Sequence, residues 1–100
     1  MTNPILPWRD SSDGTYSVAA LDGVGIWAYA ELRNDDVIQC VEWAVWLAVR
    51  RNTDPIHGGD EPGLSGFVDY GGLSVGKLAA EAALREWLAR AAEAMGVGNG

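Results

Sequence analysis

The longest apolar block of the chain lies at residues 34–52, which read N-D-D-V-I-Q-C-V-E-W-A-V-W-L-A-V-R-R-N. Asn34 is a good helix N-cap, and Asp35 and Asp36 follow where negative charge favours the positive end of the helix dipole. The valines favour a strand, but about eighteen residues without glycine or proline is long for a strand and ordinary for a helix. The pattern therefore predicts a central helix at Asn34–Asn52.

This predicted helix has two different sides when its residues are placed at roughly 100° intervals. Valine and alanine make one flat face, whereas Trp43 and Trp46 fall beside Glu42 and Arg50 on the other. Two arrangements stay open for the tryptophans. A second element covers them, because tryptophan is highly buried on average, or they are an exposed pair that anchors a partner, because Trp and Arg are enriched in interface hot spots.

Two alternating stretches come before the block. Y-S-V-A-A-L and V-G-I-W-A-Y-A-E-L flank Asp22-Gly23, a dipeptide that accepts the positive φ angles of a type I′ turn. A two-residue turn sets Leu21 opposite Val24 and puts small aliphatic residues on one face and aromatic residues on the other. We expect the aliphatic face to dock on the central helix, while the aromatic face needs its own cover or is a surface for something else.

The second half of the chain predicts a loop, a short strand and a helix. Asn52–Gly63 is a loop by its prolines and glycines, and L-S-G-F-V-D-Y after it is a possible third strand. Strong helix formers follow an N-cap candidate at Ser74 and run to about Met95, with Gly96 as the residue after the helix. The apolar stripe of this helix consists of Ala80, Leu84, Trp87, Leu88, Ala91 and Met95.

Together these elements predict an α+β fold. A β-hairpin, with a possible third short strand, packs against two α-helices in the order β-β-α-(β)-α. A chain of 100 residues suits a single domain with one core. We expect an irregular N-terminal arm at 1–14, the α+β domain at 15–96 and a flexible tail at 97–100.

The formal net charge of −7 limits the classes of partner that the protein can bind. The acid excess lies in the hairpin region and in the central loop, while both predicted helices are neutral. No basic patch is present to displace counterions, so direct binding to nucleic acid is not expected. No apolar run reaches about 18 residues, so we expect no membrane span. The N-terminus lacks the features of a secretory signal and Cys40 is the single cysteine, so a cytoplasmic protein is the default expectation.

The loop holds the best candidate for chemistry, in the pattern Asp54-x-x-His57-x-x-Asp60-Glu61. A histidine with carboxylates can ligate a divalent ion or act in acid–base catalysis. The spacing matches no common metal motif, and loops are ordinarily rich in acidic residues. We therefore predict no catalytic residue, metal ligand or cofactor, and keep a small metal-dependent or acid–base enzyme as the alternative function.

The favoured function is a non-enzymatic acidic protein-binding module whose partner has a basic surface. Most concretely, it is an inhibitor that occupies a nucleic-acid-binding surface of that partner. In size and charge the chain is similar to phage or mobile-element inhibitors such as anti-CRISPRs and other DNA mimics, a resemblance of class that no motif carries. The oligomeric state stays open. The predicted partner-binding residues are Trp43, Trp46, Glu42, Arg50, Asp54, Asp60, Glu61 and Asp69.

Overall fold

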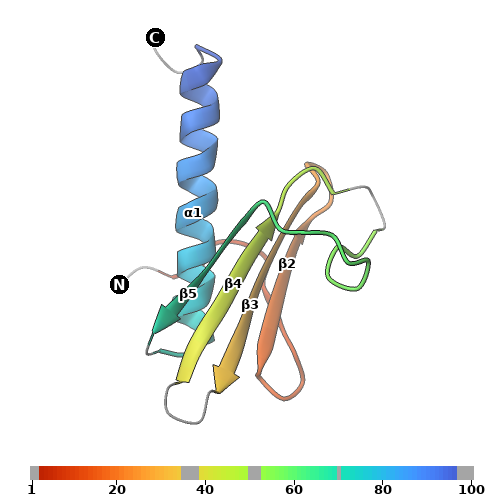
Figure 1. The fold of residues 1–100 in the computed structure, drawn as a ribbon, viewed down its shortest axis with the longest axis vertical. Coiled ribbons are helices and arrows are strands. Elements are labelled where there is room, and N and C mark those ends of the chain that lie inside the picture. The colour runs from red at the N-terminus through yellow and green to blue at the C-terminus, as the bar shows by residue number, and fades with distance from the viewer. Residues whose placement is uncertain (1–2, 35–38, 50–52, 70, 97–100) are drawn as a thin grey trace.

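The computed structural model describes residues 3–34, 39–49, 53–69 and 71–96. Within them, a five-stranded antiparallel sheet packs against a single helix, as Figure 1 shows. Each strand pairs with the next one in sequence, so the spatial order is β1-β2-β3-β4-β5. The elements are β1 (Arg9–Asp10), β2 (Tyr16–Leu21), β3 (Ile26–Asn34), β4 (Gln39–Trp46), β5 (Leu64–Asp69) and α1 (Leu73–Ala94).

The predicted helix at Asn34–Asn52 is wrong. Strand β3 ends at Asn34 and strand β4 covers Gln39–Trp46, and the two pair in antiparallel register with Trp27 opposite Trp46. Residues 35–38 and 50–52 lie outside the described residues. β4 lies between two neighbouring strands, where β-branched and aromatic side chains pack well on the pleated surface. The order β-β-α-(β)-α is therefore corrected to five strands followed by one helix.

The predicted hairpin of β2 and β3 is present, but its turn is longer than predicted. Leu21 pairs with Ile26, not with Val24, so four residues connect the strands. The positive φ of 66° falls at Gly25, where a Cβ would lie 2.8 Å from the carbonyl oxygen of Val49. A register shift of two positions leaves every side chain on its predicted face, because side chains alternate with a period of two.

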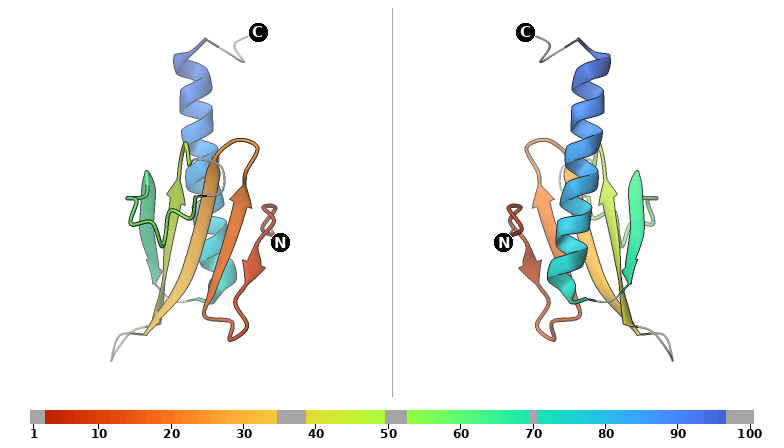
Figure 2. Two further views of the ribbon diagram at one scale, coloured as in Figure 1. Left: turned by 90° about the vertical axis from the view of Figure 1, so that its right-hand side faces the viewer. Right: turned by 90° about the vertical axis from the view of Figure 1, so that its left-hand side faces the viewer.

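The face of the sheet that carries small side chains is covered by α1. Ala19, Ala28 and Val45 of the sheet form the core with Ala80 and Leu84 of the helix. The right-hand view of Figure 2 looks at the helix with the strands behind it. Small residues on both surfaces allow the helix and the sheet to approach closely.

Helix α1 was predicted almost at its true bounds. It spans Leu73–Ala94, with Gly72 in place of Ser74 at the N-cap. Gly96 has a φ of 73° and its N–H donates to the carbonyl of Glu93 at 3.0 Å, as expected for the glycine after a helix. Figures 1 and 2 show that the second half of the helix extends past the end of the sheet.

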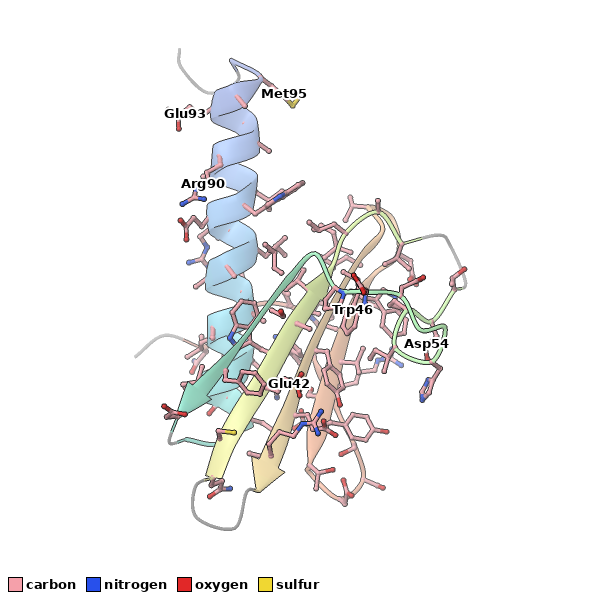
Figure 3. The ribbon with its side chains drawn as sticks, viewed as in Figure 1. Glu42, Trp46, Asp54, Arg90, Glu93 and Met95 are labelled. Atoms are coloured by element: carbon pink, nitrogen blue, oxygen red, sulfur yellow. The ribbon has the colours of Figure 1, made fainter. Side chains whose placement is uncertain are left out.

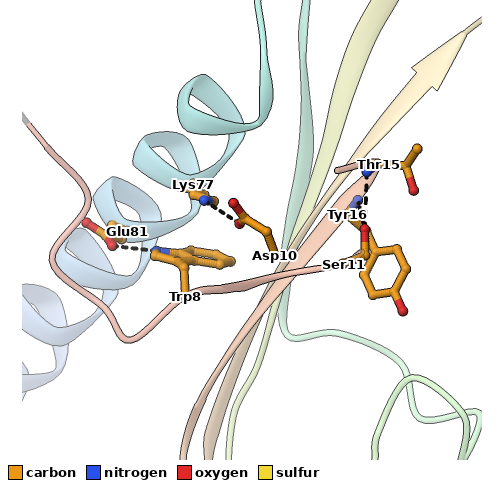
Figure 4. A network of polar contacts seen from close by, with 7 residues as sticks. All are labelled: Trp8, Asp10, Ser11, Thr15, Tyr16, Lys77 and Glu81. Atoms are coloured by element: carbon orange, nitrogen blue, oxygen red, sulfur yellow. Dashed lines mark hydrogen bonds and ion pairs between the residues drawn. The ribbon is translucent and has the colours of Figure 1, made fainter. Parts of the chain in front are cut away.

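The N-terminal arm is held to α1 by the buried carboxylate of Glu81. The backbone N–H groups of Ile5 and Leu6 donate to it at 2.8–3.0 Å, and the indole N–H of Trp8 donates at 2.7 Å (Figure 4). Burial alone raises the pKa of Glu81, but these donors outweigh it and hold the pKa below its usual range. The arm at residues 1–14 is thus tied to the helix over residues 5–8.

A second contact fixes the arm nearer the sheet. Nζ of Lys77 lies 2.7 Å from Oδ1 of Asp10 and 6.0 Å from the centre of the Trp8 ring. This hydrogen bond with Lys77 holds the pKa of Asp10 below its usual range. Asp10 belongs to β1, which adds a short edge strand to β2, so part of the predicted irregular arm is a strand.

The described part of the chain contains no helix that combines the length and the apolar character needed to span a bilayer.

Candidate functional site

The face of the sheet opposite α1 is the candidate site, and we call it the open face. Residues paired across an antiparallel sheet point to the same side, and alternate residues of a strand point to opposite sides. The residues that alternate with the core positions therefore make up the open face. They are Arg9 of β1, Tyr16, Val18 and Ala20 of β2, Trp27, Tyr29, Glu31 and Arg33 of β3, Cys40, Glu42, Ala44 and Trp46 of β4, and Ser65, Phe67 and Asp69 of β5.

Aromatic side chains form a row across the open face. The rings of Tyr16 and Tyr29 lie 6.2 Å apart, and Tyr29 meets Trp46 edge to face at the same distance. Burial, followed by the negative charge of Glu31, raises the pKa of the Tyr29 phenol well above its usual range. Phe67, on the neighbouring edge strand, is largely exposed. Such a row supplies large, rigid apolar surface at little cost in conformational entropy.

Carboxylates surround these aromatic rings. Arg33 lies between two of them, with its Nε 3.1 Å from Glu31 and its terminal nitrogen 2.6 Å from Glu42. Arg9 is the second guanidinium on this side, because it pairs with Val18. Six carboxylates against these two cations give a net charge of −4 on the described part of the open face and its loop, with His57 neutral. The six are Glu31, Glu42 and Asp69 of the strands, and Asp54, Asp60 and Glu61 of the loop.

The loop of residues 53–63 folds over the open face. The indole N–H of Trp46 donates to the carbonyl oxygen of Asp60 at 2.9 Å, and Pro55 is fully buried. Oδ1 of Asp54 accepts from the backbone N–H groups of Ile56 and His57, at 2.9 and 3.2 Å, which closes the turn at the start of the loop. Figure 3 shows Glu42 and Trp46 on β4, and Asp54 in the loop, on the side away from α1.

A cleft of about 440 Å³ lies between this loop and the hairpin of β2 and β3. Tyr16 and Glu31 are directly opposite each other in the sheet, as are Val18 and Tyr29, so four cleft residues form one continuous patch. In this cleft, aromatic rings and carboxylates of the open face and its loop line a concave surface together. Its lining consists of Tyr16, Val18, Trp27, Tyr29 and Glu31 from the strands, and Asp54, Ile56 and His57 from the loop.

His57 stands at the mouth of the cleft. Its Nδ1 lies 2.6 Å from Oδ2 of Asp54, and this hydrogen bond holds the pKa of Asp54 below its usual range. A carboxylate in this position orients an imidazole ring. Among the described residues, no three or more His, Cys, Asp or Glu side chains are grouped closely enough to hold a metal ion.

The two predicted anchor tryptophans are separated by the sheet. Trp43 faces α1 and packs against the core, whereas Trp46 lies on the open face beneath the loop. They were predicted as neighbours on a helix, but in a strand residues 43 and 46 point to opposite faces. Of the two arrangements left open, cover by other elements is the one observed for both: Trp46 is buried and Trp43 is partly buried.

Most of the predicted charged residues do come together. Glu42 and Asp69 lie on the open face, and Asp54, Asp60 and Glu61 lie in the loop beside it. Arg50 lies outside the described residues. The site residues that were not predicted are Tyr16, Trp27, Tyr29 and Phe67, although the aromatic face of the hairpin was the signal for the first three.

No family model matches the chain, and neither the curated proteins nor the solved structures include one that is significantly similar to it.

Proposed function

We propose that the protein is a non-enzymatic binding module that docks its open face on the basic surface of a partner protein. Most concretely, it acts as an inhibitor of the DNA-mimic or anti-CRISPR type, by occupying a surface where the partner binds nucleic acid. The observation that carries this proposal is the asymmetry of the sheet. One face is covered by α1, and the other presents the exposed rings of Tyr16 and Phe67 with the carboxylates of Glu31 and Glu42 between them.

The charge of the open face supports a basic partner. An excess of four negative charges on one side of a 100-residue protein speeds encounter with a positive surface and rejects negative ones. The rim carboxylates of Asp60 and Glu61 make no ion pair within the described residues and are available to a partner. Exposed Tyr16 and Phe67 add apolar contact area beside Glu31 and Glu42, which lie directly opposite them in the sheet.

The cleft gives such a partner a defined point of contact. Cations bind favourably over the faces of tyrosine and tryptophan rings, and the guanidinium of arginine stacks on them readily. Tyr16, Trp27 and Tyr29 supply the rings, and Glu31 and Asp54 supply negative charge. An arginine side chain of the partner is therefore the group that this cleft suits best.

A charge-reversal experiment tests the function. The protein captures its partner from a nuclease-treated lysate of its source cells, and surface plasmon resonance then follows association at low and at physiological salt. Asp60→Lys combined with Glu61→Lys should slow association about tenfold at low salt, and the difference should shrink when the screening length falls to about 8 Å. Trp46 binds the backbone carbonyl of Asp60, so this reversal leaves that contact in place.

The matched control reverses two charges on the helix. Glu86→Lys with Glu93→Lys changes the net charge equally but lies on α1, away from the open face, and should leave association nearly unchanged. The wild-type protein should also release a labelled 25-base-pair DNA duplex from the captured partner. If both reversed pairs behave alike, or if the duplex stays bound, the acidity serves solubility and the proposed function is wrong.

The dissociation rate of the complex tests whether the partner binds in the cleft. Tyr16→Leu should raise the dissociation rate from the captured partner about three- to tenfold, because one aromatic wall is lost. Phe67→Leu is the matched control, since it removes an exposed aromatic ring that does not line the cleft. Equal effects of the two substitutions would show that the open face binds without using the cleft.

The Asp54–His57 pair favours a second candidate, a small acid–base enzyme with its site at the mouth of the cleft. The metal-dependent form of this candidate is tested by calorimetric titration with zinc and manganese. Micromolar binding that His57→Ala abolishes would favour the enzyme over the binding module.

A further inference from the structure

The second half of α1 carries an apolar surface that the rest of the described structure covers only in part. The stripe that is buried at Ala80 and Leu84 continues to Trp87, Leu88 and Met95, which are 40 %, 47 % and 77 % exposed. The second half of the helix extends past the sheet (Figure 1), and Met95 lies at its far end (Figure 3). A helix surrounded by water has no reason to keep such a stripe, because its charged face already makes it soluble.

An apolar groove of about 340 Å³ runs along the base of this projecting segment. Its walls come from the N-terminal arm, the turn between β2 and β3, and the helix. Ile5 and Val24 on the rim are 74 % and 66 % exposed, and the two charged residues of the lining are Glu81 and Arg85. Glu81 is already bonded to the arm. The groove therefore offers little to a charged partner and much to an apolar one.

We propose that this surface binds a second copy of the same chain. The projecting helices of the two copies lie antiparallel about a two-fold axis that crosses the apolar stripe at the level of Ala89, and each fills the groove of the other. A two-fold interface uses the same patch twice, so the patch has to complement itself. This inference concerns a different surface from the open face and does not depend on the proposed function.

The spacing of large and small residues provides that complementarity. With the axis at the level of Ala89, Trp87 of one copy faces Ala91 of the other. This layer pairs one large side chain with one small one, as in facing helices that interdigitate. The pairing is possible because both kinds of residue occur within one stripe of α1.

The available area also fits a second copy. A stable interface of standard size takes about 800 Å² from each partner. The five exposed apolar side chains of the helix and groove, at 40–77 % exposure, supply on the order of 500 Å² of this. The projecting ten residues alone span only about 15 Å, so a dimer requires both the helix and the groove. A single chain presents both next to each other.

Sedimentation equilibrium of the full chain, from about 1 to 500 µM, tests the proposal. The wild-type protein should dimerise reversibly, and Leu88→Glu should raise the dissociation constant about 100-fold or more, because it puts a charge at the centre of the interface. Leu88 is half-exposed in one copy, so this variant should fold, which circular dichroism checks. Ala89→Glu is the matched control, an exposed neighbour directed away from the stripe, and should change the constant less than threefold.

Ala91→Leu separates the proposed pairing from unspecific adhesion. It enlarges the residue that faces Trp87 of the second copy, so the paired arrangement should weaken about tenfold or more, whereas adhesion of apolar surfaces should strengthen. A wild-type protein that stays monomeric up to 500 µM would overturn the proposal. So would a dimer that tolerates Leu88→Glu, or one that Ala91→Leu tightens.

Discussion

The two halves of helix α1 share one apolar stripe but have different surroundings. From Leu73 to Leu84 the helix lies on the sheet and packs so closely that a Cβ added at Gly76 would be 2.2 Å from Cγ1 of Val41. From Arg85 to Ala94 the same apolar stripe runs on only partly covered, with Trp87 40 % and Leu88 47 % exposed. An amphipathic stripe indicates that a helix is covered on one side, but whether the same chain supplies the cover depends on where the sheet ends.

Charged residues follow the same division. In the first half, buried Glu81 accepts from two backbone N–H groups and one indole, which join the arm to the helix. In the second half, Glu86 and Arg90 form an exposed ion pair at 2.6 Å. Hydrogen bonds to a buried charge are worth far more than a screened surface pair. Charged residues therefore stabilise the fold in the first half of the helix, whereas in the second half they mainly keep the surface soluble.

The largest effect that distinguishes the two halves of α1 is expected from replacing Gly76, in the half that packs on the sheet. In a helix interior Gly→Ala ordinarily stabilises, by up to about 1 kcal/mol. At Gly76 we expect the opposite sign, a loss of about 2–3 kcal/mol in the free energy of unfolding, because the new methyl group meets the fully buried Val41 and Ala30. Urea denaturation measures it. Ala89→Gly in the projecting half is the control and should cost about 1 kcal/mol; a neutral Gly76→Ala would mean that helix and sheet are not in close contact.

Glu81→Gln should cost about 1.5–2 kcal/mol, because the arm loses hydrogen bonds to a charged acceptor. Urea denaturation at pH 7 gives the value, and Glu86→Gln in the projecting half is the matched control, with an expected cost below about 0.5 kcal/mol. Equal effects of the two substitutions would contradict the role of Glu81 in holding the arm.

The pH dependence of the same pair of proteins provides an independent check. The folded pKa of Glu81 lies below its ordinary value of 4.5, so its contribution to stability is present above that pH. It is lost as the pH falls through the folded pKa, when the carboxylate becomes protonated in the native state. The difference between wild type and Glu81→Gln should therefore be constant from pH 7 to about 5 and shrink below 4.5.

The smallest effect is expected for Arg90→Ala. Exposed i,i+4 ion pairs contribute about 0.3–0.5 kcal/mol, and alanine recovers part of this through its helix propensity. Thermal denaturation at a few micromolar protein should therefore show almost no shift. A loss above about 1 kcal/mol would mean that the projecting half is packed against something even at low concentration.

Local patterns in the sequence predicted several elements of this structure, although not its overall fold. The helix at the C-terminus, its closing glycine, the short strand at Leu64–Asp69 and the division of the hairpin into aliphatic and aromatic faces are all found in the structure. These features depend on periods of two or 3.6 residues and on the backbone freedom of glycine, which neighbouring residues set by themselves. The prolines, glycines and acidic residues of the central loop also predicted the acidic loop that lies beside the open face.

Residues 39–46 show what the tertiary structure decided. Val41 and Val45 are apolar at a spacing of four, which fits one helix face as well as one strand face. Pairing with β3 on one side and β5 on the other made this segment a strand, and thereby placed Trp43 and Trp46 on opposite faces. The sequence likewise gives no sign that Glu81 differs from other glutamates of the helix. Its role comes from the hydrogen bonds of the N-terminal arm, which lies more than seventy residues away in sequence. Strand pairing and burial bring together residues that are distant in the chain. A local sequence pattern cannot predict such contacts, because it depends only on neighbouring residues.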